Sequence, residues 1–271
     1  MNTLVDCSRF EKIDSNEVDE HIFDIFTNRP PPDDLNLGFI DRSREIIDIS
    51  LEKSGMDISI QQSFSGVSTG FLCWKTAAHI SDWILGDAKC PFHSIFRLKA
   101  KDLLVIELGA GVSAICALVL SPLVNRYIAT DQKELLRLLS RNFYRNQAPS
   151  ISTSKRLQAP RVDFLEYDWE EPEVGYQNLS SVLETEPIPD FIIACDTIYN
   201  EFLVPKFVAA IKRLMHSESG ALVAIQLRDQ SVTQFFIEEV MRNNLTIYSV
   251  PPSCLSSELT LGFVVYYITI S

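Results

Sequence analysis

The sequence has few of the patterns that mark metal-binding or disulfide-bonded proteins. Its six cysteines form no CxxC pair, and its four histidines have no spacing typical of zinc ligands. Several cysteines lie inside apolar runs, where a thiol behaves as a small hydrophobic group. We therefore expect structural thiols and no metal site.

Long apolar runs are absent as well. The longest, such as LLVIEL and FVVYYITI, have the length of strands, and no window approaches the length of a membrane span. The first residues lack the basic and apolar regions of a signal peptide. We expect a protein of the cytoplasm or the nucleus, with no membrane partner.

Basic residues are scarce: the 271-residue chain has 24 Lys and Arg against 36 Asp and Glu, a formal net charge of −12. Direct nucleic-acid binding is not expected, because it depends on neutralising phosphates. Acid is concentrated in residues 1–34, which contain nine acidic and three basic residues. Two interpretations of this acidic N-terminal arm stay open: a solvated, partly disordered segment, or a surface that attracts a basic protein.

Strands and amphipathic helices alternate along the rest of the chain. After a break at 29–34, a strand pair is predicted at about 46–63 and a helix at 75–86. Further strands are predicted at 103–108, 126–131, 162–169, 190–196, 221–227, 245–250 and 261–270. Further helices are predicted at 113–122, 132–146, 203–216 and 231–244. Residues 147–160 and 171–189 are predicted to be loops.

This alternation predicts an α/β fold with one domain, residues 35–271, behind the arm of residues 1–34. Apolar strands separated by amphipathic helices specify a mostly parallel sheet covered on both faces. The last two strands are joined only by PPSCLSSE, which is too short for a helical crossover. They should pair antiparallel, so we expect an antiparallel C-terminal edge strand.

Glycines and acidic residues gather where the predicted strands end. The strand at 103–108 runs into IELGAGVS, in which Glu107 precedes Gly109 and Gly111. Such glycines let the backbone approach a ligand, and the following helix start offers unpaired N–H groups. The next strand ends in Asp131, where an acid meets the hydroxyls of a bound ribose.

Two more strand ends carry an acid next to an aromatic residue. One ends in Asp168 and Trp169, an acceptor beside a flat ring suited to an adenine, and the other ends in Asp196, followed by Tyr199. Simpler explanations exist for each: the glycines could form a tight turn, the acids could cap helices, and the aromatics could pack in the core. All of these explanations would have to hold at one edge of one sheet, which favours a ligand site.

The ligand could be a dinucleotide or S-adenosyl-L-methionine. GAGVSA passes as a variant of the dinucleotide fingerprint, but Glu107 would face a pyrophosphate unfavourably. No helix joins the last two strands, and no second domain remains for a hydride acceptor. S-adenosyl-L-methionine has a sulfonium charge and no phosphates, so the acid-rich edge favours it.

Together these residues resemble the Rossmann-like, seven-strand methyltransferases that modify protein lysines, called methyltransferase family 16. The resemblance covers roughly residue 66 to the C-terminus, and the Asp-x-x-Tyr motif and the segment around Trp74 separate this family from other methyltransferases. The motifs are TGFLCWKTA (69–77), IELGAGVS (106–113), ATDQKELLRLLSRN (129–142), DW (168–169) and ACDTIY (194–199). GVS combined with ATDQKELL looks most like the fungal branch that methylates a lysine of a large-subunit ribosomal protein. Ser113 and Lys75 depart from the usual Gly and Asp.

The resemblance implies S-adenosyl-L-methionine as cofactor and a basic protein, most closely a ribosomal protein, as substrate. The cofactor-binding residues that it implies are Trp74, Glu107, Gly109, Ala110, Gly111, Asp131, Trp169 and Cys195. It places Trp74 near the methionine end, Asp131 at the ribose, Trp169 by the adenine and the backbone around Cys195 in the wall. For Trp74, core packing remains the alternative.

Asp196 and Tyr199 are the predicted catalytic residues. Methyl transfer needs the neutral amine of lysine, and deprotonating a lysine with a pKa near 10.4 at pH 7 costs about 4.6 kcal/mol. Burial in a narrow apolar channel lowers that pKa. We hypothesise that Asp196 accepts a hydrogen bond from the arriving ammonium or from the cofactor and that Tyr199 orients the amine, while solvent takes the proton.

Several other functions stay open at this point. The substrate could be another soluble protein, such as a translation factor or chaperone, or a small molecule. A nucleic-acid methyltransferase is disfavoured by the net charge and by DTIY, where base-modifying relatives often carry an Asn-Pro-Pro-Tyr type motif. A cofactor-binding interaction module without catalysis is the non-enzyme alternative, which the intact glycines and acids disfavour.

Overall fold

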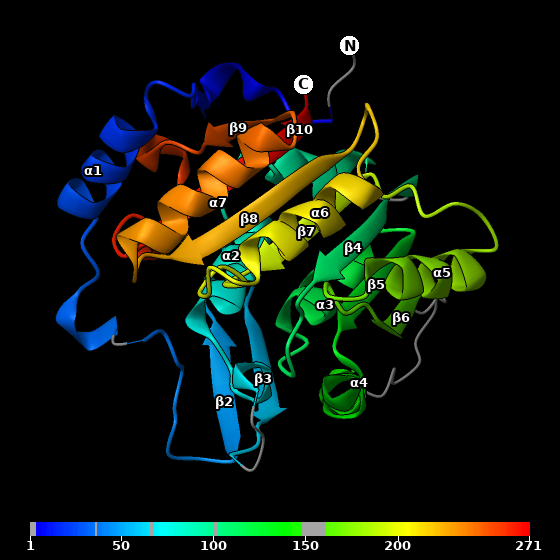
Figure 1. Ribbon diagram of the computed structural model, residues 1–271. Coiled ribbons are helices and arrows are strands. Elements are labelled where there is room, and N and C mark those ends of the chain that lie inside the picture. Colours follow the sequence, from blue (N-terminus) through cyan, green and yellow to red (C-terminus); the bar gives the residue numbers. More distant parts are fainter. Residues whose placement is uncertain (1–3, 36, 65–67, 100–101, 148–160) are drawn as a thin grey trace.

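The computed structural model describes residues 4–35, 37–64, 68–99, 102–147 and 161–271. The strands form an eight-stranded sheet in the order β1-β9-β10-β8-β7-β4-β5-β6 and a separate hairpin, β2-β3 (Figure 1). The strands are β1 (Glu11–Lys12), β2 (Ile46–Leu51), β3 (Met56–Gln61), β4 (Leu104–Leu108), β5 (Arg126–Asp131), β6 (Val162–Glu166), β7 (Phe191–Cys195), β8 (Gly220–Gln226), β9 (Leu245–Ser249) and β10 (Phe263–Ile270). The α-helices are α1 (Val18–Asn28), α2 (Lys75–Gly86), α3 (Ile115–Leu120), α4 (Lys133–Asn146), α5 (Pro172–Leu183), α6 (Val204–Leu214) and α7 (Gln230–Arg242).

The large sheet is parallel in its middle and antiparallel at one end. The five strands from β4 to β8 run parallel, whereas β10 pairs antiparallel with β8 on one side and β9 on the other. The predicted α/β fold, with a mostly parallel sheet and antiparallel C-terminal pairing, is confirmed. In detail, β10 is not the outermost strand, because β9 and then β1 lie beyond it.

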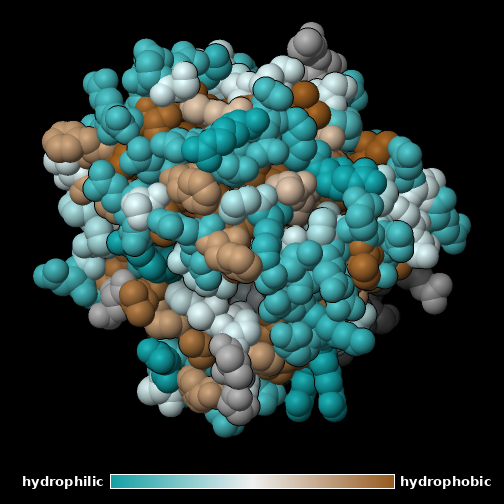
Figure 2. All heavy atoms as spheres, viewed as in Figure 1, coloured by the Kyte–Doolittle hydropathy of each residue, from teal (hydrophilic) through white to brown (hydrophobic). Residues whose placement is uncertain are grey.

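Helices cover both faces of the sheet, because neighbouring residues of a strand point to opposite sides. In β4, Val105 packs into the core that contains α2, α3 and α4, and Ile106 packs into the core that contains α1, α5, α6 and α7. The face shown in Figure 2 is mostly hydrophilic, with hydrophobic residues in small separate groups. Within the described residues, no helix has the length and apolar character needed to cross a membrane.

One predicted loop is wrong, because residues 171–189 contain the helix α5. This helix starts at Pro172, and only Gly175 and Leu179 are fully buried in it. Its apolar stripe is too narrow to stand out as a helical period in the sequence. A Cβ atom at Gly175 would lie 2.6 Å from the ring of Tyr167, so α5 packs closely against the chain that follows β6. Of the other predicted loop, residues 148–160 lie outside the described residues.

The acidic N-terminal arm is folded onto the domain. β1 extends the large sheet by pairing with β9, and α1 packs against α7 (Figure 1). Ile22 and Ile25 on α1 are fully buried, while Asp19, Glu20 and Asp24 stay exposed. The interpretation as a solvated, partly disordered segment is therefore wrong for the described residues 4–34. α1 is amphipathic, so its acids face solvent while its apolar stripe joins the core.

The β2-β3 hairpin confirms the predicted strand pair. Its strands are antiparallel, with Ile47 opposite Ile60. It packs against α2 and α4, on the side of the large sheet where the parallel strands end (Figure 1). The chain between β3 and α2 then runs past those strand ends.

Candidate active site

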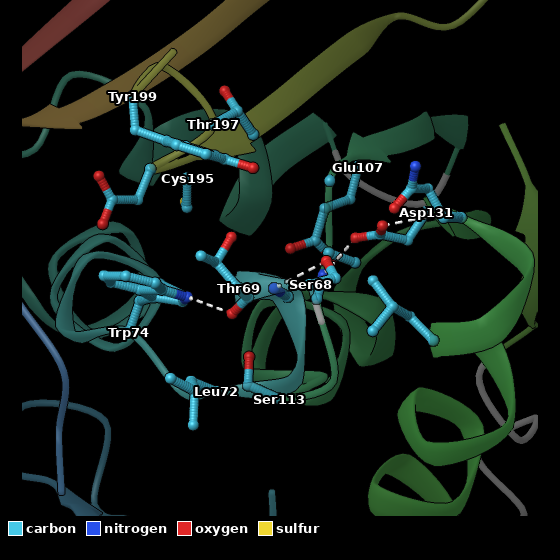
Figure 3. A pocket seen from close by; sticks show the side chains of 18 of the residues that line it. Ser68, Thr69, Leu72, Trp74, Glu107, Ser113, Asp131, Cys195, Thr197 and Tyr199 are labelled. Carbon is cyan, nitrogen blue, oxygen red and sulfur yellow. Dashed lines mark hydrogen bonds between the residues drawn. The ribbon is translucent and has the colours of Figure 1, made fainter. Parts of the chain in front are cut away.

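A single pocket brings together all ten residues predicted for the site. Loops that follow the parallel strands β4, β5, β6 and β7 form its floor and one wall, and the segment before α2 forms the facing wall (Figure 3). The predicted residues lining it are Trp74, Glu107, Gly109, Ala110, Gly111, Asp131, Trp169, Cys195, Asp196 and Tyr199. The carboxyl edge of the parallel sheet therefore carries a pocket, at the place where open α/β sheets bind their ligands.

The glycine loop after β4 adopts a backbone that only glycine accepts readily. Gly109 has φ of +72° and Gly111 has φ of +58°. A Cβ atom at Gly109 would also lie 2.7 Å from the side chain of Thr197 and 3.1 Å from the ring of Trp169. The tight-turn explanation holds, and the turn also lines the pocket. The turn exposes backbone on the pocket side because no side chain covers it.

Asp131 joins the end of β5 to this glycine loop. One carboxylate oxygen accepts a hydrogen bond from the Gly111 N–H at 2.7 Å, and the other accepts one from the Gln132 N–H at 2.7 Å. Burial raises the pKa of Asp131 to about 6, although these two N–H groups lower it. The N-cap of α4 is Gln132, so Asp131 does not cap that helix. Its carboxylate is held rigidly at the pocket wall, with lone pairs left for a diol.

Glu107 lies on the pocket floor and is 3% exposed. The hydroxyl of Tyr127 donates a hydrogen bond to its carboxylate at 2.9 Å. Burial raises the pKa of Glu107 to about 7, and the hydrogen bond from Tyr127 lowers it only in part. A positively charged ligand would favour the ionised form, whereas an anionic ligand would be repelled. This environment opposes a pyrophosphate and suits a cationic cofactor.

Trp169 both packs in the core and lines the pocket. Its ring meets Phe207 edge to face, with 4.9 Å between the ring centroids. Its indole Nε1 is buried, and no partner for it is found among the described residues. A buried N–H group without a partner carries a free-energy cost that a ligand acceptor would remove. The two explanations for Trp169 are therefore compatible.

The aromatic side chains of Trp74 and Tyr199 line the end of the pocket opposite Asp131. Trp74 stands just before α2, packs against Phe39 in a tilted arrangement with 4.3 Å between ring centroids, and donates from Nε1 to the Thr69 carbonyl at 3.3 Å. Tyr199 is 47% exposed, and its hydroxyl points into the pocket (Figure 3). An apolar opening of this kind suits the methylene chain of a lysine, with a hydroxyl available to its nitrogen.

Asp196 lines the pocket but has a partner that the sequence analysis missed. Arg228, just beyond β8, donates from Nη1 to one carboxylate oxygen at 2.7 Å and from Nη2 to the other at 2.5 Å. The Asp196 side chain is only 1% exposed. Its predicted role as a direct acceptor for the ammonium is therefore not supported by the geometry, because both oxygens already face a cation. Arg228 could have been suspected, since it directly follows the predicted strand 221–227.

Asp196 does not cap a helix, which was the alternative explanation for it. Its backbone has φ of +61°, a left-handed conformation that is costly for a residue with a Cβ atom. Its N–H donates to the Ala224 carbonyl at 2.8 Å, and α6 begins eight residues later, at Val204. The turn after β7 thus aims this carboxylate across the sheet toward the end of β8.

Comparison with known proteins identifies the family. The sequence profile described as lysine methyltransferase matches residues 52–242, about seven tenths of the chain. The chain belongs to this family. It is an enzyme that transfers methyl groups to lysine, with S-adenosyl-L-methionine as its cofactor.

Relatives cover most of the chain. A protein of Lachancea thermotolerans is 26% identical over 97% of this chain and 99% of its own length. Proteins of Eremothecium gossypii (29% identical, 74% of this chain, 71% of its own) and Saccharomyces cerevisiae (25%, 88% and 94%) are also similar. All three are named ribosomal lysine N-methyltransferase 5. The solved structure of SMU.776 complexed with SAH is similar in fold, with a TM-score of 0.52, 12% identity, and coverage of 85% of this chain and 57% of that chain.

The pocket fits this lysine methyltransferase's cofactor in three respects. The loop from Gly109 to Gly111 lines the pocket with backbone that carries no bulky side chain. The Asp131 carboxylate lies on the same edge of the sheet as Glu107 and is held by the Gly111 N–H. The buried Nε1–H of Trp169 could donate a hydrogen bond to an acceptor nitrogen of an adenine. Glu107 suits the positive charge of the methionine portion.

Proposed function

We propose that this enzyme methylates a lysine of a large-subunit ribosomal protein, in the cytoplasm or the nucleus. The observation that carries the proposal is the similarity, over 97% of the chain, to a protein named for ribosomal lysine methylation. The net charge of −12 supports it, because an acidic enzyme attracts a basic protein substrate.

The chemistry of the pocket is consistent with lysine as the acceptor. The glycine loop and Asp131 would hold S-adenosyl-L-methionine, which would supply an electrophilic methyl group on a cationic sulfur to the lone pair of a neutral lysine nitrogen. The ammonium first loses a proton to solvent. Trp74 lines the opening of the pocket and packs against Phe39. Desolvation of an ammonium in such an apolar setting lowers its pKa, and the Tyr199 hydroxyl orients the nitrogen.

The proposal is tested with tritiated S-adenosyl-L-methionine, the purified enzyme, and extract from cells that lack it, separated into ribosomes and soluble protein. We expect label on one large-subunit ribosomal band. Label only on a soluble protein would contradict the ribosomal target, and would point to a substrate such as a translation factor. No label, despite measurable cofactor binding, would point to a small-molecule substrate.

Tyr199→Phe tests the role of the hydroxyl. We expect kcat to fall about tenfold to hundredfold, because loss of an orienting group misplaces the nitrogen. Affinity for S-adenosylhomocysteine should change little, as measured by calorimetry. Tyr144→Phe, which changes an exposed tyrosine on α4 outside the pocket, is the matched control and should keep full activity. Equal activity of the two variants would refute the assignment of Tyr199.

A further inference from the structure

Arg228 stands at the centre of a polar junction beside the lysine end of the pocket. Besides the two bonds to Asp196, its Nε and Nη2 donate to the Leu37 carbonyl at 3.2 and 2.8 Å. Nη2 also donates to the Gln226 side chain at 2.9 Å. Nη2 has two hydrogens and three acceptors within reach, so one of its hydrogens is shared. The planar, five-donor guanidinium still contacts all three groups from fixed directions, which the single ammonium of a lysine cannot do.

The same junction fixes the aromatic wall. The Arg228 guanidinium lies 5.1 Å from the centre of the Trp74 ring, and Trp74 packs against Phe39. Residues 37–40 are held there by backbone bonds, since the Lys75 N–H donates to the Gly38 carbonyl at 2.8 Å and the Ile40 N–H donates to the Cys73 carbonyl at 3.0 Å. Arg228 therefore connects the segment before the hairpin to the end of β8 across the pocket rim.

The charge at this junction decides which form of the substrate lysine the pocket favours. An isolated carboxylate within about 4–6 Å of an ammonium raises the pKa of that ammonium by 1–3 units. Such a shift would oppose methyl transfer, which needs the neutral amine. With Arg228 bound to both oxygens, Asp196 contributes little net charge, and its side chain is shielded.

Other charged or titratable groups lie around the same pocket. Tyr199 and Cys195 come from the loop that carries Asp196, and Arg42 lies over Phe39 at 5.1 Å. The ends of β4 and β5 contribute Glu107 and Asp131, and the loop after β6 contributes Tyr167 and Asp168. Within the described part of the chain, none of these groups forms a hydrogen bond or ion pair with Asp196, so the pairing with Arg228 dominates the electrostatics of its carboxylate.

We propose that Arg228 is a positioning residue for methyl transfer, which neutralises Asp196 so that this carboxylate does not hold the incoming lysine as an ammonium ion. The inference rests on the proposed transfer to lysine and names the residue that sets the protonation state of the substrate. Asp196 then acts through Arg228, fixing its guanidinium against the aromatic wall.

The test is the pH dependence of kcat with a lysine-containing substrate, measured for the wild type and four variants. In Arg228→Ala the unpaired carboxylate should move the midpoint of the kcat profile up by about 1 unit or more, with at least a tenfold loss of kcat at pH 7. Arg228→Ala combined with Asp196→Asn should bring the midpoint back to the wild-type value. Arg228→Lys should keep that midpoint but lower the maximal kcat, because charge is retained and the fork is lost.

Asp196→Asn alone should shift the midpoint in the opposite direction, because Arg228 is then an uncompensated cation beside the lysine. This variant also tests whether Arg228 neutralises Asp196 if Arg228→Ala does not fold. Thermal unfolding and binding of S-adenosylhomocysteine are measured for each protein. For Arg228→Ala and Arg228→Lys we expect wild-type affinity, because Arg228 does not line the pocket.

An unchanged midpoint in folded Arg228→Ala, or an equal shift in the double variant, would overturn the inference while leaving the lysine transfer intact. If Arg228→Ala does not fold, an unchanged or raised midpoint in Asp196→Asn would overturn it too. Absence of lysine methylation by the wild type would instead overturn the proposed function.

Discussion

At the scale of single residues, the pocket is distinguished by acids held in unfavourable surroundings. Glu107 is fully enclosed at the floor, and its nearest polar partner is the neutral hydroxyl of Tyr127. Its pKa is raised to about 7, so near neutral pH the free enzyme holds a mixture of protonated and ionised Glu107. A cationic ligand would form an electrostatic pair with the ionised carboxylate.

Binding of S-adenosyl-L-methionine should therefore tighten as the pH rises. The ionised fraction of a carboxyl group with a pKa of about 7 increases about tenfold between pH 6 and pH 8, and the dissociation constant should fall by a similar factor. Glu107→Gln should bind more weakly at pH 8 and lose most of this dependence. Calorimetry at several pH values measures both effects. Asp131, whose pKa is raised to about 6, is present in both proteins, so the smaller dependence left in Glu107→Gln is assigned to it. The same pH dependence in Glu107→Gln would exclude Glu107 as its source.

The same shift affects the stability of the free enzyme. The unfolded chain releases the Glu107 proton near pH 4.5, whereas the folded protein keeps it until about pH 7. The folded state binds more protons in this window, so Glu107 lowers the free energy of unfolding as the pH rises through it. A bound cation reverses this contribution.

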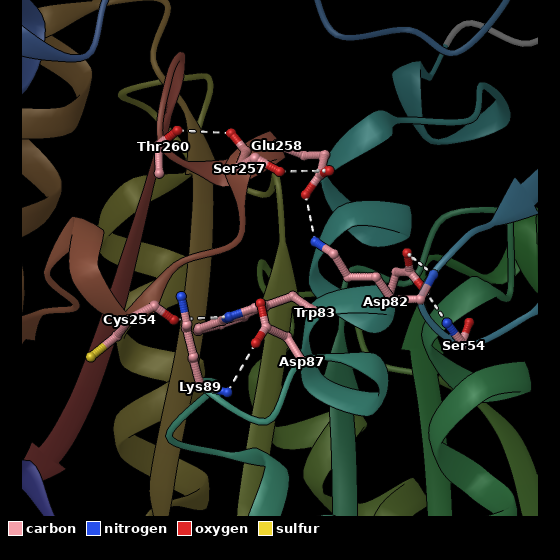
Figure 4. Close-up of polar contacts among 10 residues, drawn as sticks. Ser54, Asp82, Trp83, Asp87, Lys89, Cys254, Ser257, Glu258 and Thr260 are labelled. Atoms are coloured by element: carbon pink, nitrogen blue, oxygen red, sulfur yellow. Dashed lines mark hydrogen bonds and ion pairs between the residues drawn. The ribbon is translucent and has the colours of Figure 1, made fainter.

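At the scale of elements, side chains rather than backbone pairing attach the β2-β3 hairpin to the domain. On α2, the Asp82 carboxylate accepts hydrogen bonds from the Lys53 and Ser54 N–H groups at the hairpin turn, at 3.0 and 2.7 Å (Figure 4). Lys53 also forms an ion pair with Glu258 at 2.7 Å. On α4, Asn142 and Asn146 bond to the open edge of β3. The hairpin thus has a fixed position beside the pocket.

Asn142→Ala should lower the free energy of unfolding by about 2–4 kcal/mol. The side chain is fully buried, and it bonds to the N–H and carbonyl of Gln61 and to the Val112 carbonyl at 2.7–2.9 Å, all of which lose a partner. Asn146→Ala removes similar bonds from the half-buried Ser59 edge, where water can replace them, and should cost about 1 kcal/mol. Urea unfolding of both variants measures the difference. Equal costs would contradict the importance of burial.

At the scale of the whole molecule, the acidic arm is both structural and electrostatic. Deleting residues 1–34 would remove β1 and the buried Ile22 and Ile25, and the loss of one large core side chain alone costs about 2–5 kcal/mol. Such a deletion would unfold the domain before it revealed any role in substrate binding. Replacing exposed acids separates the two roles.

Neutralising Asp19, Glu20 and Asp24 to their amides should raise the Michaelis constant for a basic protein substrate about two- to fivefold at low ionic strength. The effect should shrink in 0.5 M salt, because salt screens the attraction between exposed charges. Neutralising Glu184, Glu186 and Glu218, which are exposed elsewhere, is the matched control with the same change in net charge. Equal effects of the two sets would show that net charge, and not the arm, attracts the substrate.

The sequence by itself determined most elements of the sheet and the residues of the pocket. The bounds predicted for α2 and β5 match the structure to the residue, because Gly86 ends one amphipathic pattern and Asp131 ends an apolar run. The pocket residues could be predicted because strand ends of a parallel sheet meet at one edge, whatever the details of packing. Local periodicity and the topology that it implies carried that information.

Only the tertiary structure decided the partner of Asp196 and the fate of the N-terminal arm. Asp196 and Arg228 follow neighbouring strands 32 residues apart in the chain, and nothing local indicates that two side chains on these turns will meet. The acidic residues of α1 suggest a solvated segment, and its apolar stripe becomes buried only because α1 packs against α7. Each outcome depends on surfaces that form when distant segments pack, and such surfaces leave no periodic signal in the sequence.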